Sequence, residues 1–364
     1  MIKKTLIACS TPYTVLNAVN YRFGLPSEEL VDIIIFTFTP SVKKLVNLLK
    51  REKVFEIVYE AHDIRQTKLM PLLLFMSYLF PRMVLKILKI NSYPIDYDVI
   101  ISQNYLFITL MRGLNLRAEY FLIEEGLTSY TGRILKPKGH NSKIKQLYRN
   151  IFRDKIDPQV KGKYLYSPEM IIESPHPKIF RLPGFKMNKS TIYNNLFGYK
   201  ENYLYKEKKV IFTGAPDMIW RKCAVDYNVM NEYEFFSKHV LCHFNPDDVI
   251  FRPHPAEKEY ERYLDIALDK YNNQWELECF YNLTDEHIII NFFSTTAVTP
   301  KLLFDKEPVV IFLYKLSNYG KELVDKYDEF INELKNMYRN KSRVIVINDL
   351  RELNCLKTKF LLHI

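Results

Sequence analysis

The chain has 364 residues, of which 48% are hydrophobic and 26% are charged. This composition excludes a mainly disordered protein and is large enough for two domains. The formal net charge of +10 favours anionic partners, but the basic residues are scattered instead of forming a stripe, so we expect no nucleic-acid binding. Neither GxGxxG nor GxxxxGK[ST] occurs, which excludes the common glycine-rich phosphate loops.

The first half of the chain alternates between strand-like and helix-like segments. The expected strands are residues 5–7, 31–38, 54–59, 99–102 and 120–123, and the expected helices include 13–21 and 42–51. Strands that alternate with helices predict βαβ units and a parallel sheet. The alternation stops between about residues 136 and 200, and we interpret that stretch as an irregular excursion followed by a linker.

A second alternating series follows the linker. The expected strands are residues 209–213, 248–251, 288–291, 309–313 and 343–347, and the expected helices are 232–241, 257–271, 295–304 and 323–338. We therefore predict an α/β protein with two Rossmann-like domains, 1–190 and 191–364, that face each other across a cleft in the GT-B arrangement. Ligands of open α/β sheets bind at the carboxyl ends of the strands, so chemistry is sought there.

The first candidate site is Glu124-Glu125-Gly126, directly after the expected strand 120–123. Adjacent side chains on an extended segment face opposite ways, so one carboxylate can point into a cleft, and Gly126 lets the chain turn away. A carboxylate in that place can act as a general base on an acceptor hydroxyl. The alternative is a solvated acidic loop.

The second candidate is Arg252-Pro253-His254-Pro255, after the expected strand 248–251. The prolines restrict the backbone around His254, and a rigid imidazole at a strand end can donate to a phosphate or protonate it as it leaves. Arg252 would add positive charge. A structural role for His254 stays open.

The third candidate is Ser294-Thr295-Thr296, after the expected strand 288–291. Hydroxyl residues cap helix N-termini, and the free N–H groups of such a terminus can also hold a phosphate. Plain capping is the alternative. No metal site is expected, because the one DxD triplet, Asp96-Tyr97-Asp98, precedes its strand, and His239 and His243 have no acidic or thiol partner that stands out.

These motifs resemble those of bacterial sialyltransferases, which carry a D/E-D/E-G motif, an HP motif and an S/T-rich motif in the same order. The segment Glu124 to Tyr130 and the opening Cys9-Ser10-Thr11-Pro12-Tyr13 are similar to glycosyltransferase family 52, the lipooligosaccharide and capsule sialyltransferases. The resemblance spans both halves of the chain through short motifs. It implies an inverting, metal-independent transfer of sialic acid from CMP-sialic acid to a galactose-type hydroxyl of a surface glycan.

The resemblance also implies roles for individual residues. Glu125, or else Glu124, would be the general base, and Asp217, which follows Gly214 at another strand end, is the reserve candidate. His254 would contact or protonate the donor phosphate. The remaining donor-binding residues would be Gly214, Arg252, Pro255, Ser294, Thr295 and Thr296. No cofactor is implied beyond the donor substrate.

Three further questions stay open in the sequence. Another donor, such as CDP-glycerol or a UDP-hexose, fits the same plan, and a non-enzymatic, membrane-associated binding protein is the alternative from a different class.

Residues 69–80 are mostly apolar but shorter than the roughly 20 residues of a spanning helix. They are either buried or begin a membrane-surface patch. Its further members would be Leu85, Ile87, Leu88 and Ile90, among Lys86 and Lys89.

The expected location follows from the cysteines and the start of the chain. The 5 cysteines form no CxxC pair, which predicts neither a disulfide framework nor a zinc knuckle. The apolar stretch after Lys3 and Lys4 is too short for a signal peptide. We expect a cytoplasmic protein, with peripheral attachment to the inner membrane if the patch exists.

Overall fold

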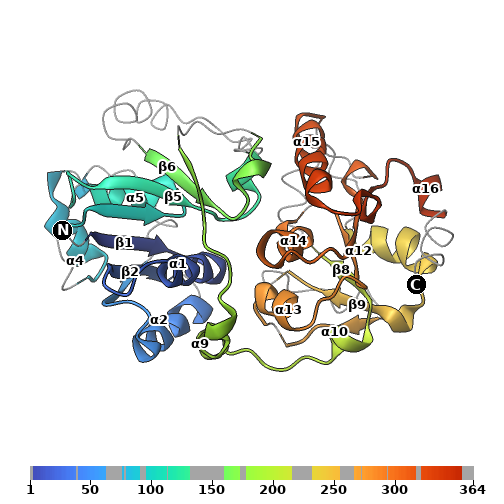
Figure 1. Ribbon diagram of the computed structural model, residues 1–364, viewed down its shortest axis with the longest axis horizontal. Helices are drawn as coiled ribbons and strands as arrows, with labels where there is room; N and C mark the ends of the chain where they lie inside the picture. The colour runs from blue at the N-terminus through green and yellow to red at the C-terminus, as the bar shows by residue number, and fades with distance from the viewer. Residues whose placement is uncertain are drawn as a thin grey trace. The chain divides into compact units, whose positions relative to one another are not determined.

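A computed structural model describes the chain over residues 3–37, 40–62, 76–77, 79–90, 96–112, 114–131, 160–172, 178–214, 232–254, 266–271, 273–292, 294–316 and 321–354. The chain forms two compact units (Figure 1). The first comprises Met1–Glu125, Pro137–Pro168 and Ser174–Gly198, and the second Gly126–Lys136, Glu169–Glu173 and Tyr199–Ile364. The main division thus falls after Gly198, whereas the sequence predicted it after residue 190, and two short segments between residues 126 and 173 belong to the second unit.

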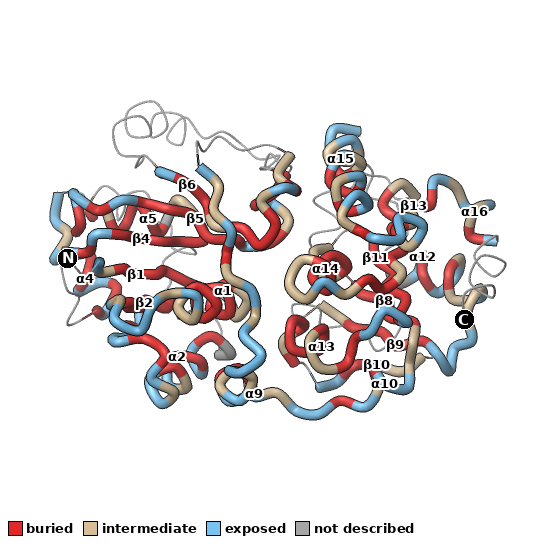
Figure 2. The backbone as a smooth tube through the Cα atoms, viewed as in Figure 1, coloured by how far each residue is buried: buried red, intermediate tan, exposed pale blue. Residues whose placement is uncertain are grey.

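The first unit is built on a parallel sheet of 7 strands in the order β3-β2-β1-β4-β5-β6-β7. The strands are β1 (Lys4–Cys9), β2 (Leu30–Thr37), β3 (Val58–His62), β4 (Val99–Ser102), β5 (Glu119–Ile123), β6 (Val160–Leu165) and β7 (Ile179–Arg181). Most of their residues are apolar and buried, as Figure 2 shows for β1, β4 and β5, because helices cover the sheet.

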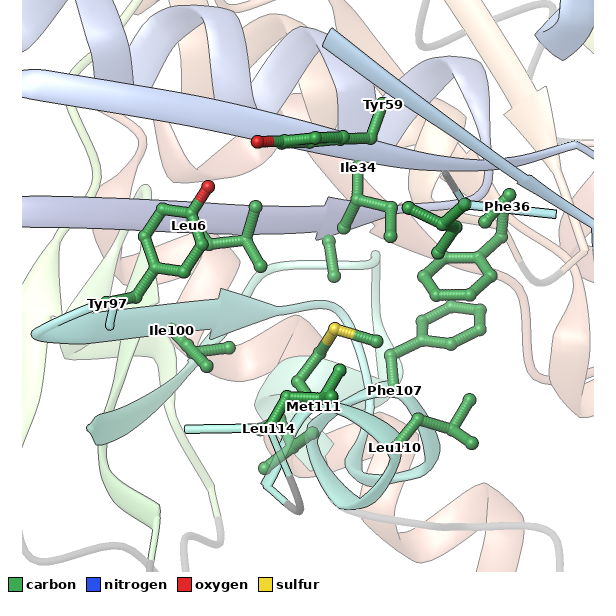
Figure 3. Close-up of a cluster of buried hydrophobic side chains, with 14 of the residues drawn as sticks. Leu6, Ile34, Phe36, Tyr59, Tyr97, Ile100, Phe107, Leu110, Met111 and Leu114 are labelled. Atoms are coloured by element: carbon green, nitrogen blue, oxygen red, sulfur yellow. The ribbon is translucent and has the colours of Figure 1, made fainter. Parts of the chain in front are cut away.

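The helices of the first unit are α1 (Pro12–Gly24), α2 (Pro40–Glu52), α4 (Pro81–Ile87), α5 (Tyr105–Arg112) and α9 (Ser190–Phe197). Helices α1, α2 and α5 contact strands of the sheet, and α9 packs on α2. Alternate strand residues such as Leu6 and Ile34 join α4 and α5 in one core cluster. Within it the rings of Phe36 and Phe107 are stacked, with centroids 4.1 Å apart (Figure 3).

The second unit has a parallel sheet of 6 strands in the order β10-β9-β8-β11-β12-β13. The strands are β8 (Val210–Thr213), β9 (Val249–Arg252), β10 (Ala267–Leu268), β11 (Ile288–Asn291), β12 (Val309–Phe312) and β13 (Val344–Val346). The helices are α6 (Thr128–Thr131), α10 (Leu204–Glu207), α12 (Glu232–Phe235), α13 (Trp275–Tyr281), α14 (Thr299–Phe304), α15 (Lys321–Met337) and α16 (Leu350–Asn354).

Several local predictions were wrong. The excursion between residues 136 and 200 contributes β6 and β7 to the first sheet, and Ala267–Leu268 is a strand where the helix 257–271 was expected. The predicted helix 295–304 is divided into a 3₁₀ turn, Thr295–Ala297, and α14, because Pro300 has no N–H and is placed in the first turn of a new helix. The predicted helix 232–241 is α12 continued by a π-helical turn, Phe236–Val240.

Candidate functional site

Glu124 lies directly after β5 and is almost fully buried, at 1% exposure. One carboxylate oxygen accepts from the Tyr13 hydroxyl at 2.7 Å and the other from the Tyr166 backbone N–H at 3.0 Å. The Asn17 amide donates to the Glu124 carbonyl at 2.8 Å. Charge-assisted hydrogen bonds of this kind are strong and hold the side chain in place. Glu124 therefore ties the ends of β5 and β6 to α1.

Glu125, the next residue, is exposed. Because neighbouring side chains of an extended segment point to opposite sides, the inward Glu124 directs Glu125 outward. Glu125 interacts electrostatically with Lys163 of β6, which is itself buried. Burial lowers the pKa of Lys163, and the negative charges of Glu125 and Glu124 act in the opposite direction. Of the two predicted bases, Glu125 is therefore the one whose carboxylate reaches solvent.

The turn after β1 completes this edge of the first sheet. Thr11 caps α1, and both Thr14 and the Ser10 backbone N–H contact Gln103 Oε1, at 2.7 and 2.8 Å. Burial raises the pKa of the Cys9 thiol to about 12, so this cysteine is a packing residue and not a nucleophile. The edge therefore offers one outward carboxylate on a scaffold of internal hydrogen bonds.

In the second unit, the strand ends that carry the His-Pro and Ser/Thr motifs flank β8. Asn291 and Thr296 both donate to the Thr213 hydroxyl at the end of β8, the latter at 3.1 Å. The Ser294 hydroxyl accepts from the Thr296 backbone N–H at 3.3 Å, so Ser294 is the predicted cap. This cap precedes a 3₁₀ turn of 3 residues and not the long helix that was expected, so the dipole of a long helix does not act at this position. The polar groups that the Ser/Thr turn offers are therefore mainly hydroxyls.

Arg252 is buried in the second unit. Its guanidinium forms an ion pair with Asp269, donates to the Tyr205 hydroxyl at 3.1 Å and lies 5.0 Å from the centre of the Trp275 ring. These partners occupy the guanidinium, which argues against the predicted phosphate contact. The Trp275 indole N–H in turn donates to the Thr296 carbonyl at 2.9 Å. Trp275 thus connects the end of β9 to the Ser/Thr turn.

His254 follows β9 and is partly buried, two residues beyond Arg252. Gly214 follows β8, and its N–H donates to the Arg252 carbonyl at 3.2 Å. The structure therefore brings Gly214, the base of the His-Pro loop and the Ser/Thr turn to one edge of the second sheet. Asp217 and Pro255, the other two predicted site residues, lie outside the described residues.

Gly126 is the last residue of the acidic motif. It belongs to the second unit and has a φ of +116°, a conformation that L-residues with a side chain rarely adopt. A β-carbon at this position would lie 3.4 Å from the Thr295 methyl. After Gly126 the chain forms α6, where the rings of Tyr130 and Phe330 are 5.9 Å apart. The third residue of the acidic motif is therefore packed on the Ser/Thr turn.

No group of three or more His, Cys, Asp and Glu residues is placed to hold a metal ion within the described part of the chain. The Asp96-Tyr97-Asp98 triplet precedes β4, as predicted, and Asp98 accepts the Lys4 N–H at 2.9 Å. In the same ranges, no helix has both the length and the apolar character needed to cross a membrane.

The sequence interpretation missed Lys163, Trp275 and Thr213. Lys163 lies in the stretch that was expected to be irregular, and Trp275 begins a helix, α13, that was not predicted. The scarcity of tryptophan, with 2 in the chain, was a usable signal for Trp275. Nothing in the local pattern marks Thr213, since its partners are about 80 residues away.

No protein-family model matches the chain, and no curated protein matches it. Solved structures do. A putative UDP-N-acetylglucosamine 2-epimerase from Listeria monocytogenes has a TM-score of 0.50 at 10% identity, over 100% of this chain and 97% of the other. A UDP-glucose: anthocyanidin 3-O-glucosyltransferase in complex with UDP has a TM-score of 0.49 at 10% identity, over 98% and 99%. MurG from Acinetobacter baumannii has 0.44 at 10% identity, over 98% and 90%.

At this level of identity the likeness concerns the fold alone. Together with the two parallel α/β sheets, it confirms the predicted GT-B fold. The resemblance to glycosyltransferase family 52 stays a prediction, and so do the roles of the site residues.

The contacts of Glu124 predict that substitutions of the two acidic residues have different effects on the stability of the protein. Glu124→Gln places an amide N–H₂ against either the Tyr13 hydroxyl or the Tyr166 N–H, and loss of that partner should cost about 1–3 kcal/mol of unfolding free energy. Glu125→Gln is the matched control and should change it by less than about 0.5 kcal/mol. Urea denaturation measures both, and equal losses would contradict the assignment of Glu124 as the structural carboxylate.

Trp275 should stabilise the second unit through both its N–H and its ring. Trp275→Phe keeps an aromatic ring beside Arg252 but removes the donor to Thr296, and should cost about 1 kcal/mol. Trp275→Ala also removes the ring and should cost about 3–5 kcal/mol. Thermal or urea unfolding gives the comparison, with the exposed Tyr271→Phe as control. Similar losses for Phe and Ala would show that the ring contributes nothing.

Proposed function

We propose that the protein is a glycosyltransferase that uses a nucleotide-activated sugar and bears its general base on the first unit and its donor-phosphate site on the second. The observation that carries the proposal is the edge of the second sheet, where Gly214, the base of the His-Pro loop and the hydroxyl groups of the Ser/Thr turn come together. The GT-B fold supports the same class, since nucleotide-sugar enzymes are named among the similar structures.

In the proposed reaction, Glu125 accepts the proton of the acceptor hydroxyl as that oxygen bonds to the anomeric carbon of the donor sugar. The bond from this carbon to the donor phosphate breaks, and the phosphate oxygen takes the electron pair. Stabilising this developing charge is the main catalytic task. His254 donates to or protonates the departing phosphate, while Ser294 and Thr295 line its site. Thr296 and Arg252, with their internal hydrogen bonds, hold the two loops in position.

For the donor, we favour a UDP-hexose. Several similar structures are named for UDP or UDP-sugars, including the Listeria monocytogenes protein. CMP-sialic acid is the second candidate, and the order of the three motifs favours it: Glu124-Glu125-Gly126, His254-Pro255, then Ser294-Thr295-Thr296. The acceptor is proposed to be a glycan hydroxyl in both cases. CDP-glycerol remains a third donor to test.

A donor screen tests the proposal directly. Calorimetry with UDP, CMP and CDP-glycerol should give tight binding of UDP, and incubation with UDP-glucose, UDP-N-acetylglucosamine or CMP-sialic acid should release the matching nucleotide. Binding of CMP but not UDP would replace the hexosyl donor by the sialyl donor. Binding of none of these nucleotides would contradict the whole proposal and favour a non-enzymatic binding protein.

His254→Ala should lower the rate of nucleotide release by about 100-fold or more, the usual contribution of an acid–base residue. His239→Ala is the control, because its ring packs beside Phe235 on a different segment. Circular dichroism should be the same for both variants. A His254→Ala enzyme with wild-type rates would remove the imidazole from the mechanism.

The position of Lys163 beside the acidic motif predicts that this lysine influences the pH dependence of kcat/KM. Its positive charge favours the ionised form of a neighbouring carboxylate, so its removal disfavours that form. In Lys163→Met, the acid limb of the kcat/KM profile should therefore move to higher pH. Lys163→Arg keeps the charge and should leave the limb in place. An unshifted limb in Lys163→Met would show that this lysine does not influence the base.

A further inference from the structure

Helix α4 (Pro81–Ile87) has two different apolar faces. Val84, Leu85 and Leu88 are buried in the core cluster of the first unit. On the other side four large apolar side chains are 43% to 58% exposed. These exposed side chains are Leu79, Phe80, Met83 and Ile87. Met83 and Ile87 are one helical turn apart, and Phe80 is the N-cap residue directly before the helix, so the three form an apolar stripe.

Positive charges border this stripe. Arg82, Lys86 and Lys89 are exposed, and the sequence from Met76 to Ile90 contains no Asp or Glu. Lys89 has a φ of +55°, so the helical conformation stops there. The long aliphatic stems of lysine and arginine can lie along an apolar surface while the charged ends reach outward. The surface is therefore apolar in the middle and cationic beside it, without a compensating anion on the same segment.

We propose that this face of α4 is a docking surface for an anionic lipid bilayer, with Phe80, Met83 and Ile87 entering the interfacial region and Lys86 and Lys89 facing lipid phosphates. Apolar side chains beside lysines are typical of helices that lie on membranes, whereas protein–protein interfaces are depleted in lysine. The net charge of +10 acts in the same direction. The argument depends only on exposure and charge, and is independent of the proposed transferase activity.

The structure changes the composition of the patch expected from sequence. Of the four apolar members expected after residue 80, Leu85, Leu88 and Ile90 are buried and only Ile87 is exposed. Phe80, from the expected stretch 69–80, is exposed as well, and Met83 is an exposed member that was not expected. A surface with so few apolar side chains binds reversibly and needs the electrostatic contribution as a second signal.

The test is co-sedimentation of the full-length protein with vesicles of phosphatidylcholine alone or with 30% phosphatidylglycerol. Wild-type protein should bind the anionic vesicles, and less so in high salt, because surface charges are screened. Met83→Ser/Ile87→Ser should lower the partition coefficient at least tenfold. Lys86→Gln/Lys89→Gln should lower it by about fivefold for each lysine. The first pair removes the apolar contribution and the second the electrostatic one.

Matched controls come from the same unit. Leu116→Ser removes another exposed apolar side chain, and Lys43→Gln/Lys44→Gln removes two exposed lysines of α2. Both should bind vesicles as the wild type does. The proposal is overturned if wild-type protein ignores anionic vesicles or if the α4 variants bind equally well. It is also overturned if sedimentation velocity shows a dimer that Met83→Ser/Ile87→Ser converts to monomers, since the stripe would then bind a second copy.

Discussion

The inward anchoring of Glu124 is the constraint from which the proposed chemistry of the first unit follows. A buried carboxylate is costly unless its oxygens are hydrogen-bonded, and Tyr13 and Tyr166 supply those bonds. Because a strand places consecutive side chains on opposite sides, fixing Glu124 inward also fixes Glu125 outward. One acidic residue thus provides structure so that its neighbour can be presented in a defined direction, which is what a general base requires.

The second unit uses a comparable arrangement with different residues. Asn291 and Thr296 meet at the Thr213 hydroxyl, and Trp275 connects Thr296 to the vicinity of Arg252. These contacts join the ends of three adjacent strands through side chains that are far apart in sequence. Since Arg252 is two residues before His254, the buried ion pair with Asp269 also restrains the loop that carries the imidazole. Here the charged residue of the motif is held by partners within the second unit.

The sequence predicted those strands and helices whose burial leaves a clear apolar pattern. Strands with a continuous apolar run, such as Val99–Ser102 and Ile288–Asn291, were predicted with correct bounds, because central strands of a parallel sheet are covered on both faces. Strand β6, with the sequence VKGKYL, was missed because two lysines and a glycine hide its apolar pattern. Helix α13 was missed because Glu276 and Glu278 are buried against Gln274 and Asn273, contacts that local polarity does not predict.

The candidate site, too, was predictable only where the local sequence carried the signal. The three motifs were visible because each stands where a strand ends, but the residues that hold them became apparent only from the folded chain. Gly126 shows why. Its positive φ explains a glycine after two acidic residues, as turn chemistry predicts. A β-carbon in its place would lie 3.4 Å from the methyl of Thr295, which is 169 positions further along the chain. The glycine therefore serves two purposes, since it turns the chain after Glu125 and packs it on the Ser/Thr turn. A β-branched residue here would strain the backbone and bring its γ-atoms toward Thr295, which would disturb the acidic motif and the hydroxyl cluster together.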